Sequence, residues 1–158
     1  MKVERIDHIH IAVRNLDKAI SFFETALGTK FSPPLNVEKD DLGNNIGMRS
    51  VLDPLGLEVF TPASERSAIH HFLEQRGEGL HAISFKVDDI EAAIKHLEES
   101  GMRLVGRITL GNLKEAQFHP KDSFGFMIEL CEYQEKSTTY VACTEQDLPR
   151  SLQDGRGA

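Results

Sequence analysis

Two histidines and two glutamates are placed where they could do chemistry together. His8 and His10 lie two residues apart in the apolar stretch Ile6–Val13, and alternate side chains of a β-strand share one face. Glu58 and Glu129 each interrupt another short apolar run. A carboxylate in such a strand is costly to bury unless it is paired, protonated or bound to a metal. The pattern therefore indicates either a site for a divalent metal ion or a strand face that is covered by water.

The strand that carries the two histidines belongs to a pattern that occurs twice. Ile6–Val13 is followed by an amphipathic helix with Asn15 as its expected N-cap and Gly28 at its end. Leu80–Val87 is a second apolar strand, and a helix with the same apolar spacing follows it behind an expected cap at Asp88. We interpret this as an internal repeat of about 75 residues, in which one strand-helix-strands unit is used twice.

Turn residues and apolar spacing predict the remaining elements. Hairpins are predicted at Met48–Phe60 and Lys114–Cys131, and a helix at about Ser64–Gln75. Thr29–Ser32 can form a short strand, whereas residues 36–45 are mostly polar and typical of a loop.

Alignment of the two copies reveals an asymmetry in the candidate site. When the last valines of the two strands are aligned, His8 falls opposite Ala82. His81 then falls opposite Asp7, and on a regular strand it would point to the other face. A β-bulge would restore it. Alternatively, His10 could supply a second imidazole from the face that His8 occupies. The sequence leaves these two alternatives open.

Composition excludes several classes of partner. The chain has 158 residues and a formal net charge of −7, which argues against nucleic acid or an anionic membrane surface as its partner. It contains no apolar run long enough to span a bilayer, and its first residues do not resemble a signal peptide. Cys131 and Cys143 form neither a metal-binding spacing nor a disulfide framework. A cytoplasmic location is the expectation that fits best.

The chain resembles the vicinal oxygen chelate superfamily, which includes glyoxalase I, extradiol dioxygenases and bleomycin-resistance proteins. Within it, the resemblance is to the methylmalonyl-CoA epimerases. It covers most of residues 5–132, and the order of the matching stretches is more specific than any one of them. The stretches that carry it are Ile6–Val13, Leu16–Gly28, Leu57–Pro62, Ser67–Gly79, Leu80–Val87, Asp88–Leu97, Phe118–Lys121 and Ile128–Leu130.

The resemblance implies an α+β fold in which paired βαβββ units form a cup-shaped mixed sheet with flanking helices. The units are expected at about 5–62 and 80–132, within a single domain at 1–132. Residues 133–158 are expected to form a C-terminal extension that is partly mobile.

The resemblance also implies one divalent metal ion, such as Co, Zn, Ni, Mn or Fe, inside the cup. The family's ligands map onto His8, Glu58 and Glu129. The remaining ligand is the second histidine of a His–His pair in the epimerases, and that position is Ala82 here. His81 matches the first histidine of the pair, so we retain it as a candidate metal ligand.

The activity implied is that of a metal-dependent epimerase or isomerase acting on a small acid or its CoA thioester through a metal-stabilised enolate. Glu129 is the candidate for moving the proton. Epimerisation calls for a second group on the other side of the substrate, and the strand Met48–Leu52, where some epimerases have it, offers no acid. A homodimer is expected by resemblance. The alternatives are a non-catalytic protein that binds a small ligand, and an iron-dependent dioxygenase using His10 or His81 beside His8 and Glu129.

Overall fold

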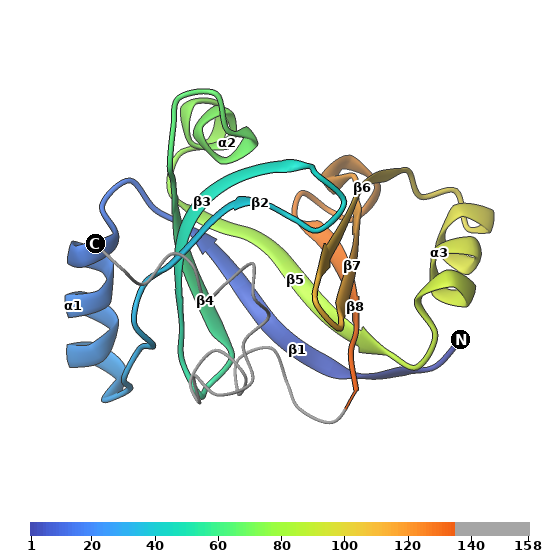
Figure 1. Ribbon diagram of the computed structural model, residues 1–158, viewed down its shortest axis with the longest axis horizontal. Helices are drawn as coiled ribbons and strands as arrows, with labels where there is room; N and C mark the ends of the chain where they lie inside the picture. The colour runs from blue at the N-terminus through green and yellow to red at the C-terminus, as the bar shows by residue number, and fades with distance from the viewer. Residues whose placement is uncertain (135–158) are drawn as a thin grey trace.

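A computed structural model of the chain describes residues 1–134. It is an α+β structure in which one curled eight-stranded sheet is flanked by helices (Figure 1). The predicted fold class is confirmed. The elements, in chain order, are β1 Val3–Ala12, α1 Leu16–Leu27, β2 Leu35–Lys39, β3 Asn45–Leu52, β4 Leu57–Pro62, α2 Ala68–Arg76, β5 Gly79–Val87, α3 Ile90–Glu99, β6 Leu104–Leu110, β7 Leu113–Phe118, the 3-10 helix η1 Pro120–Asp122, and β8 Met127–Glu132.

The sheet is built from two halves that have the same internal order. Its strand order is β2-β3-β4-β1-β5-β8-β7-β6, so that each half is a strand, a helix and three further strands. β1 and β5 pair antiparallel at the centre, and each pairs in parallel with the last strand of its own half, β4 or β8. This arrangement gives the sheet an internal two-fold relation between β1 and β5. Figure 1 shows these two strands crossing the middle of the molecule, with α1 and α3 at opposite ends.

The two equivalent helices begin at polar caps and pack their apolar faces on the sheet. Asn15 accepts a hydrogen bond from the backbone of Lys18, as its position predicted. In the second unit the cap is Asp89, one residue after the predicted Asp88. Leu16 of α1 belongs to a buried cluster with residues of β3 and β4, and Ile94 of α3 to one with residues of β7 and β8. The helices therefore support the strands that carry the glutamates.

The predicted strand at Thr29–Ser32 was wrong, and the second strand lies in the stretch expected to be a loop. Ser32 is tied to Leu52 by two hydrogen bonds, one of them through its side chain, and does not continue into a ladder. β2 forms instead from Leu35, where Leu35 and Val37 are buried and the polar residues alternate with them. A strand with one polar face shows this alternation of period two, which the high polar content of the segment concealed.

The other differences are smaller. α2 begins at Ala68 behind the cap Ser67, a few residues later than predicted. β6 was not predicted as a separate element. The expected hairpins are present as β3–β4 and β7–β8. The C-terminal extension predicted at 133–158 lies outside the described residues, apart from Tyr133 and Gln134.

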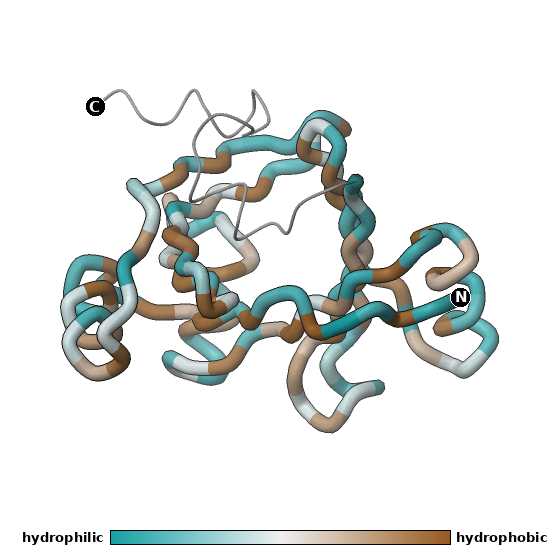
Figure 2. Tube along the Cα trace, turned by 90° about the horizontal axis from the view of Figure 1, so that it is seen from below, coloured by the Kyte–Doolittle hydropathy of each residue, from teal (hydrophilic) through white to brown (hydrophobic). Residues whose placement is uncertain are grey.

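Apolar side chains hold the two halves together from the inside of the curl. One buried cluster joins β2 and β3 of the first half to β6, β7 and β8 of the second, and also includes Tyr133. Figure 2 shows the alternation of hydrophilic and hydrophobic residues along the strands, as expected for a sheet with two different faces. Within residues 1–134, no helix is long and apolar enough to cross a membrane.

Candidate metal centre

The two histidines of β1 lie at the centre of the sheet, where its two halves meet. His8 pairs with Ser84 and His10 with Ala82 in the antiparallel β1–β5 ladder. Both histidines are buried, and their ring centroids are 4.5 Å apart. The sequence prediction that His8 and His10 share one face of a strand is therefore confirmed.

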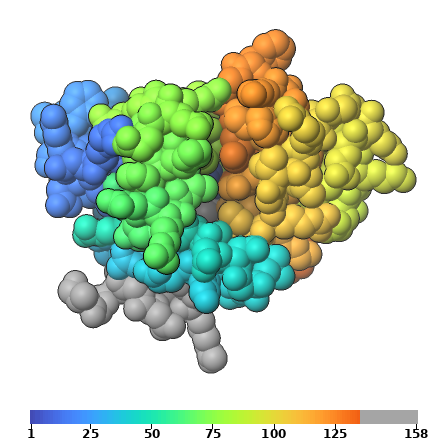
Figure 3. Space-filling model, turned by 90° about the horizontal axis from the view of Figure 1, so that it is seen from above, coloured from blue at the N-terminus to red at the C-terminus, as the bar shows by residue number. Residues whose placement is uncertain are grey.

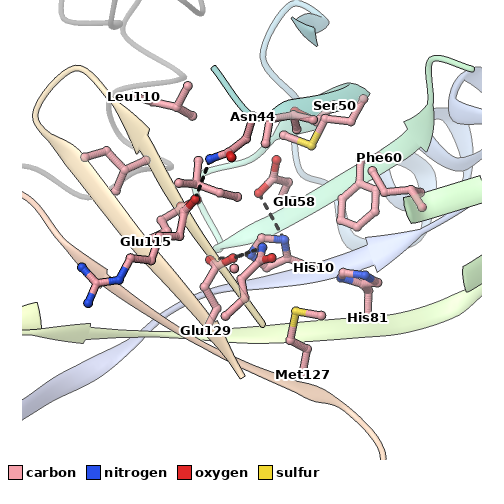
Figure 4. Close-up of a pocket in the computed structure, with 18 of the residues that line it drawn as sticks. His10, Asn44, Ser50, Glu58, Phe60, His81, Leu110, Glu115, Met127 and Glu129 are labelled. Carbon is pink, nitrogen blue, oxygen red and sulfur yellow. Dashed lines mark hydrogen bonds and ion pairs between the residues drawn. The ribbon is translucent and has the colours of Figure 1, made fainter. Parts of the chain in front are cut away.

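Glu58 and Glu129 reach this pair from the strands on either side. Glu58 lies beside His10 in the parallel β1–β4 pair, and Glu129 lies beside Ser84 in the parallel β5–β8 pair. His8 Nε2 is 3.6 Å from Glu58 Oε2 and also 3.6 Å from Glu129 Oε1. His10 lies between the two carboxylates, with Nε2 3.1 Å from Glu129 Oε1 and Nδ1 3.5 Å from Glu58 Oε2 (Figure 4). Side chains from three segments that are distant in sequence thus form one buried cluster.

A hydrogen bond to Asp7 fixes the orientation of the His8 ring. Its Nδ1 lies 2.9 Å from Asp7 Oδ2. An ionised carboxylate only accepts hydrogen bonds, so Nδ1 carries the proton and Nε2 is left with a lone pair facing the cluster. Asp7 in turn accepts hydrogen bonds from the Tyr133 hydroxyl and from Arg5 Nη2. Burial raises the pKa of Asp7, but the hydrogen bonds and charge of its partners outweigh burial and hold that pKa below its ordinary value.

The electrostatics of the cluster favour a positive charge between the carboxylates. Burial lowers the pKa of His10, but the negative charges of Glu129 and Glu58 and the hydrogen bond to Glu129 raise it to about 10. Burial likewise raises the pKa of Glu129, and the charge of His10 together with the hydrogen bonds from His10 and Gln117 lowers it to about 2. In the absence of a metal ion, a protonated His10 supplies the positive charge here.

His81 lies in a β-bulge, at the edge of the cluster. His10 pairs with Ala82 but Ile11 pairs with Leu80, which leaves His81 as an extra residue on β5. Its ring contacts Phe60 and Phe72 at centroid distances of 5.3 and 4.8 Å, and is 6.4 Å from His10. Burial, followed by the positive charge of His10, lowers the pKa of His81 to about 4. The bulge brings His81 to the wall of the cavity, beside His10.

Sequence reasoning missed one acidic residue of the site, Glu115 on β7. Its carboxyl group is buried at the cavity wall, and burial followed by the charge of Glu129 raises its pKa well above the ordinary value. Among the described residues it makes no hydrogen bond or ion pair. Gln117, two residues further along the same strand, donates to Glu129 Oε2 at 2.9 Å. The alternation of Leu113, Glu115 and Gln117 on one face of the predicted hairpin was the signal that could have identified Glu115.

The cluster forms one end of a cavity inside the curl of the sheet. The cavity has a volume of about 340 Å³ and is lined mainly by apolar side chains, near the lower limit of about 300 Å³ for small-molecule pockets. Its walls come from both halves, with Met48 and Phe60 on one side and Leu110 and Met127 on the other. In Figure 3, α2 and its neighbours in green face the second half in yellow and orange. A small ligand would therefore meet the polar cluster at the bottom of an apolar pocket.

The side chains fit a divalent metal ion. Within residues 1–134, His8 Nε2 is buried and makes no hydrogen bond, which leaves a lone pair without a partner there at the centre of the cluster. The ligand atoms of His8, His10 and Glu58 lie within 4.8 Å of one another, as do those of His8, Glu115 and Glu129. His81 belongs to neither group. Imidazole and carboxylate together suit zinc, cobalt, manganese and iron.

The chain is similar to known proteins over most of its length. A family model described as the Glyoxalase/Bleomycin resistance protein/Dioxygenase superfamily matches residues 5–130. The uncharacterized protein YqjC of Bacillus subtilis (strain 168) is 32% identical over 133 residues, which cover 82% of this chain and 93% of that protein. The ethylmalonyl-CoA/methylmalonyl-CoA epimerase of Cereibacter sphaeroides is 31% identical over 134 residues, which cover 81% and 97%.

Solved structures show the same similarity. A variant of Streptomyces coelicolor methylmalonyl-CoA epimerase in complex with 2-nitronate-propionyl-CoA superposes with a TM-score of 0.68 at 27% identity, over 85% of this chain and 100% of that one. The methylmalonyl-CoA epimerase of Mycobacterium tuberculosis superposes with a TM-score of 0.67 at 29% identity, over 84% and 90%. The chain belongs to the Glyoxalase/Bleomycin resistance protein/Dioxygenase superfamily.

Proposed function

We propose that the protein is a metal-dependent epimerase that acts on a short branched acyl-CoA of the methylmalonyl type. The observation that carries the proposal is the buried cluster of His8, Glu58 and Glu129, whose two glutamates line the apolar cavity. The similarity to methylmalonyl-CoA epimerases over more than four fifths of the chain supports the substrate class.

Three residues in the cluster would hold the metal ion. His8 offers Nε2, and Glu58 and Glu129 each place a carboxylate oxygen 3.6 Å from that nitrogen. A divalent cation held by these residues would supply Lewis-acid chemistry, namely polarisation of a thioester carbonyl and stabilisation of the charge that develops on its oxygen. The apolar walls keep water away from the acyl group, which strengthens every charge interaction at the cluster.

The proton must leave the α carbon on one face and return on the other, which requires two acid–base groups. We assign one of these roles to Glu129, as the sequence suggested, and the other to Glu115. Glu129 is held by His10 and Gln117, so its position is fixed. Glu115 is free to donate or accept a proton, because among the described residues no other group bonds to its carboxylate. β7 thereby supplies the carboxyl group that is absent from Met48–Leu52.

Exchange of the α hydrogen with solvent tests this function directly. The metal-loaded protein is incubated with methylmalonyl-CoA in D₂O, and deuterium at the α carbon is followed by mass spectrometry. His8→Ala and Glu129→Ala should slow incorporation by at least about 100-fold, because general acid–base groups alone contribute about 10²–10⁴-fold. His71→Ala, which changes an exposed residue of α2, should exchange like the wild type. Absence of incorporation by the metal-loaded wild type would exclude this substrate.

A second function is favoured by one feature of the cluster. His8, His10 and Glu58 make a group of two histidines and one carboxylate, which is typical of iron-dependent oxygenases. Oxygen consumption by the iron-loaded protein with a catechol would identify that activity. A protein that binds a small ligand without catalysis would show neither oxygen consumption nor α-hydrogen exchange. The predicted homodimer is tested separately by sedimentation of the full chain.

A further inference from the structure

The two imidazoles of the cluster both come from the first half of the chain. β1 supplies His8 and His10, whereas the equivalent positions of β5 hold Ala82 and a serine. The glutamates, by contrast, obey the internal two-fold relation. Glu58 lies beside His10, and Glu129 lies beside the serine that is equivalent to His10. The carboxylates of the cluster are therefore placed symmetrically, and the imidazoles are not.

The register of the central strands shows how this asymmetry is accommodated. His10 and Ala82 are direct partners in the antiparallel β1–β5 pair. Such partners project from the same face of a sheet, with Cβ atoms about 4.5–5.5 Å apart. A side chain at either position therefore reaches the same part of the cavity. Ala82 is fully buried, so this pair carries one ring, on β1, opposite one methyl group, on β5.

We propose that His10 is the fourth metal ligand of this site, supplied by β1 in the place of an imidazole at position 82 of β5. His10 lies 3.1 Å from Glu129 and 3.5 Å from Glu58, measured from its two ring nitrogens. It also lies within 4.8 Å of the ligand atoms of His8 and Glu58. This inference deepens the proposed function, because it rests on the metal ion which that function needs.

His81 is the competing source of an imidazole, and its surroundings differ from those of His10. Its ring packs against Phe60 and Phe72, and Figure 4 shows it to the side of the glutamates. In the part of the chain that the structure describes, its buried Nδ1 makes no hydrogen bond, and His81 is not among the residues whose ligand atoms converge. We therefore assign His81 to the wall of the cavity rather than to the metal.

Cobalt binding to the metal-free full chain tests the assignment. The affinity for Co²⁺ is measured by calorimetry and the ligand field by visible absorption, for the wild type and three variants. His10→Ala should weaken binding by at least about 100-fold, because losing even an outer-shell partner of a ligand weakens binding by about 10–100-fold. His81→Ala should bind as the wild type does. The double variant His10→Ala/Ala82→His exchanges the two side chains without altering composition, and should recover most of the lost affinity.

Wild-type binding with His10→Ala, or a large loss with His81→Ala, would overturn the assignment. If His10→Ala does not fold, as judged by circular dichroism, the wild type alone decides the question. Zn²⁺ added to protein with ¹⁵N-labelled histidine rings should shift the ring nitrogens of His8 and His10 and leave those of His81 in place. A shift at His81 without one at His10 would refute the proposal, as would failure of the wild type to bind Co²⁺ or Zn²⁺.

These readouts do not depend on the substrate. A protein that binds Co²⁺ through His10 but does not exchange the α hydrogen of methylmalonyl-CoA would refute the proposed function and leave the ligand assignment standing. If the wild type exchanges the α hydrogen but His10→Ala binds Co²⁺ normally, the ligand assignment is refuted and the proposed function stands.

Discussion

The hydrogen bond between Asp7 and His8 should control the affinity of the metal site. Asp7→Asn preserves the size of the side chain but replaces one acceptor oxygen with an NH₂ group. Asp7 now accepts from His8 Nδ1 at 2.9 Å, from Arg5 Nη2 at 3.3 Å and from the Tyr133 hydroxyl. An amide presents one acceptor atom, so it cannot serve all three donors. If its NH₂ group faces His8, it favours the tautomer with the proton on Nε2, which removes the lone pair from the cluster.

The size of the effect follows from this role. Outer-shell partners of ligating histidines are worth about 10–100-fold in metal affinity, which is about 1.4–2.8 kcal/mol at about 1.4 kcal/mol per tenfold change. We expect Asp7→Asn to lose affinity for Co²⁺ within this range. The measurement is calorimetric titration of the metal-free full chain, with thermal unfolding followed by circular dichroism to establish that the variant is folded.

Tyr133→Phe is the matched control, because it removes a hydrogen bond to Asp7 and leaves in place the hydrogen bond that His8 donates to Asp7. Its loss of affinity should be less than about tenfold, the lower limit for outer-shell partners. Unchanged Co²⁺ affinity in a folded Asp7→Asn protein would refute the reasoning. An equal loss in both variants would show that Asp7 acts by holding Tyr133 rather than by orienting His8.

Two further predictions concern other carboxyl groups. Glu115→Gln should slow deuterium exchange at the α carbon by about 10²–10⁴-fold, because an amide neither donates nor accepts the proton at this pH. Unchanged exchange by the folded variant would contradict the role assigned to Glu115. Asp40 accepts hydrogen bonds from backbone N–H groups of Asn44 and Thr109; burial raises its pKa, but these bonds and that from the Asn44 side chain outweigh burial and lower it below the ordinary 3.8. Asp40→Asn should therefore lower the free energy of unfolding by about 1–3 kcal/mol at pH 7. This difference from the wild type should shrink as the pH falls below about 4, through the pKa of the folded state. A difference that is constant with pH would argue against a role for the charge.

The sequence determined the elements whose pattern is local. Apolar spacing and caps such as Asn15 located α1, and strand alternation placed His8 and His10 on one face, because these signals span only a few residues. The repeat also placed His8 opposite Ala82. It aligned Asp7 with His81, and both prove to be the extra residues of bulges in the β1–β5 pair. The polar alternation of β2, however, could not be distinguished from a loop.

Only the tertiary structure decided which side chains meet. Whether His10 or His81 lies between the glutamates depends on the register of β1 against β5 and on the bulge at His81. Pairing between strands that are distant in the chain leaves no local pattern in the sequence of either strand. The alternation along β7 could have marked Glu115 as a candidate, but only the pairing of β7 with β8 brings it to the cluster. The residue types that could bind a metal were visible in the sequence. Their selection follows from strand register, because a shift of one residue moves a side chain to the opposite face of the sheet.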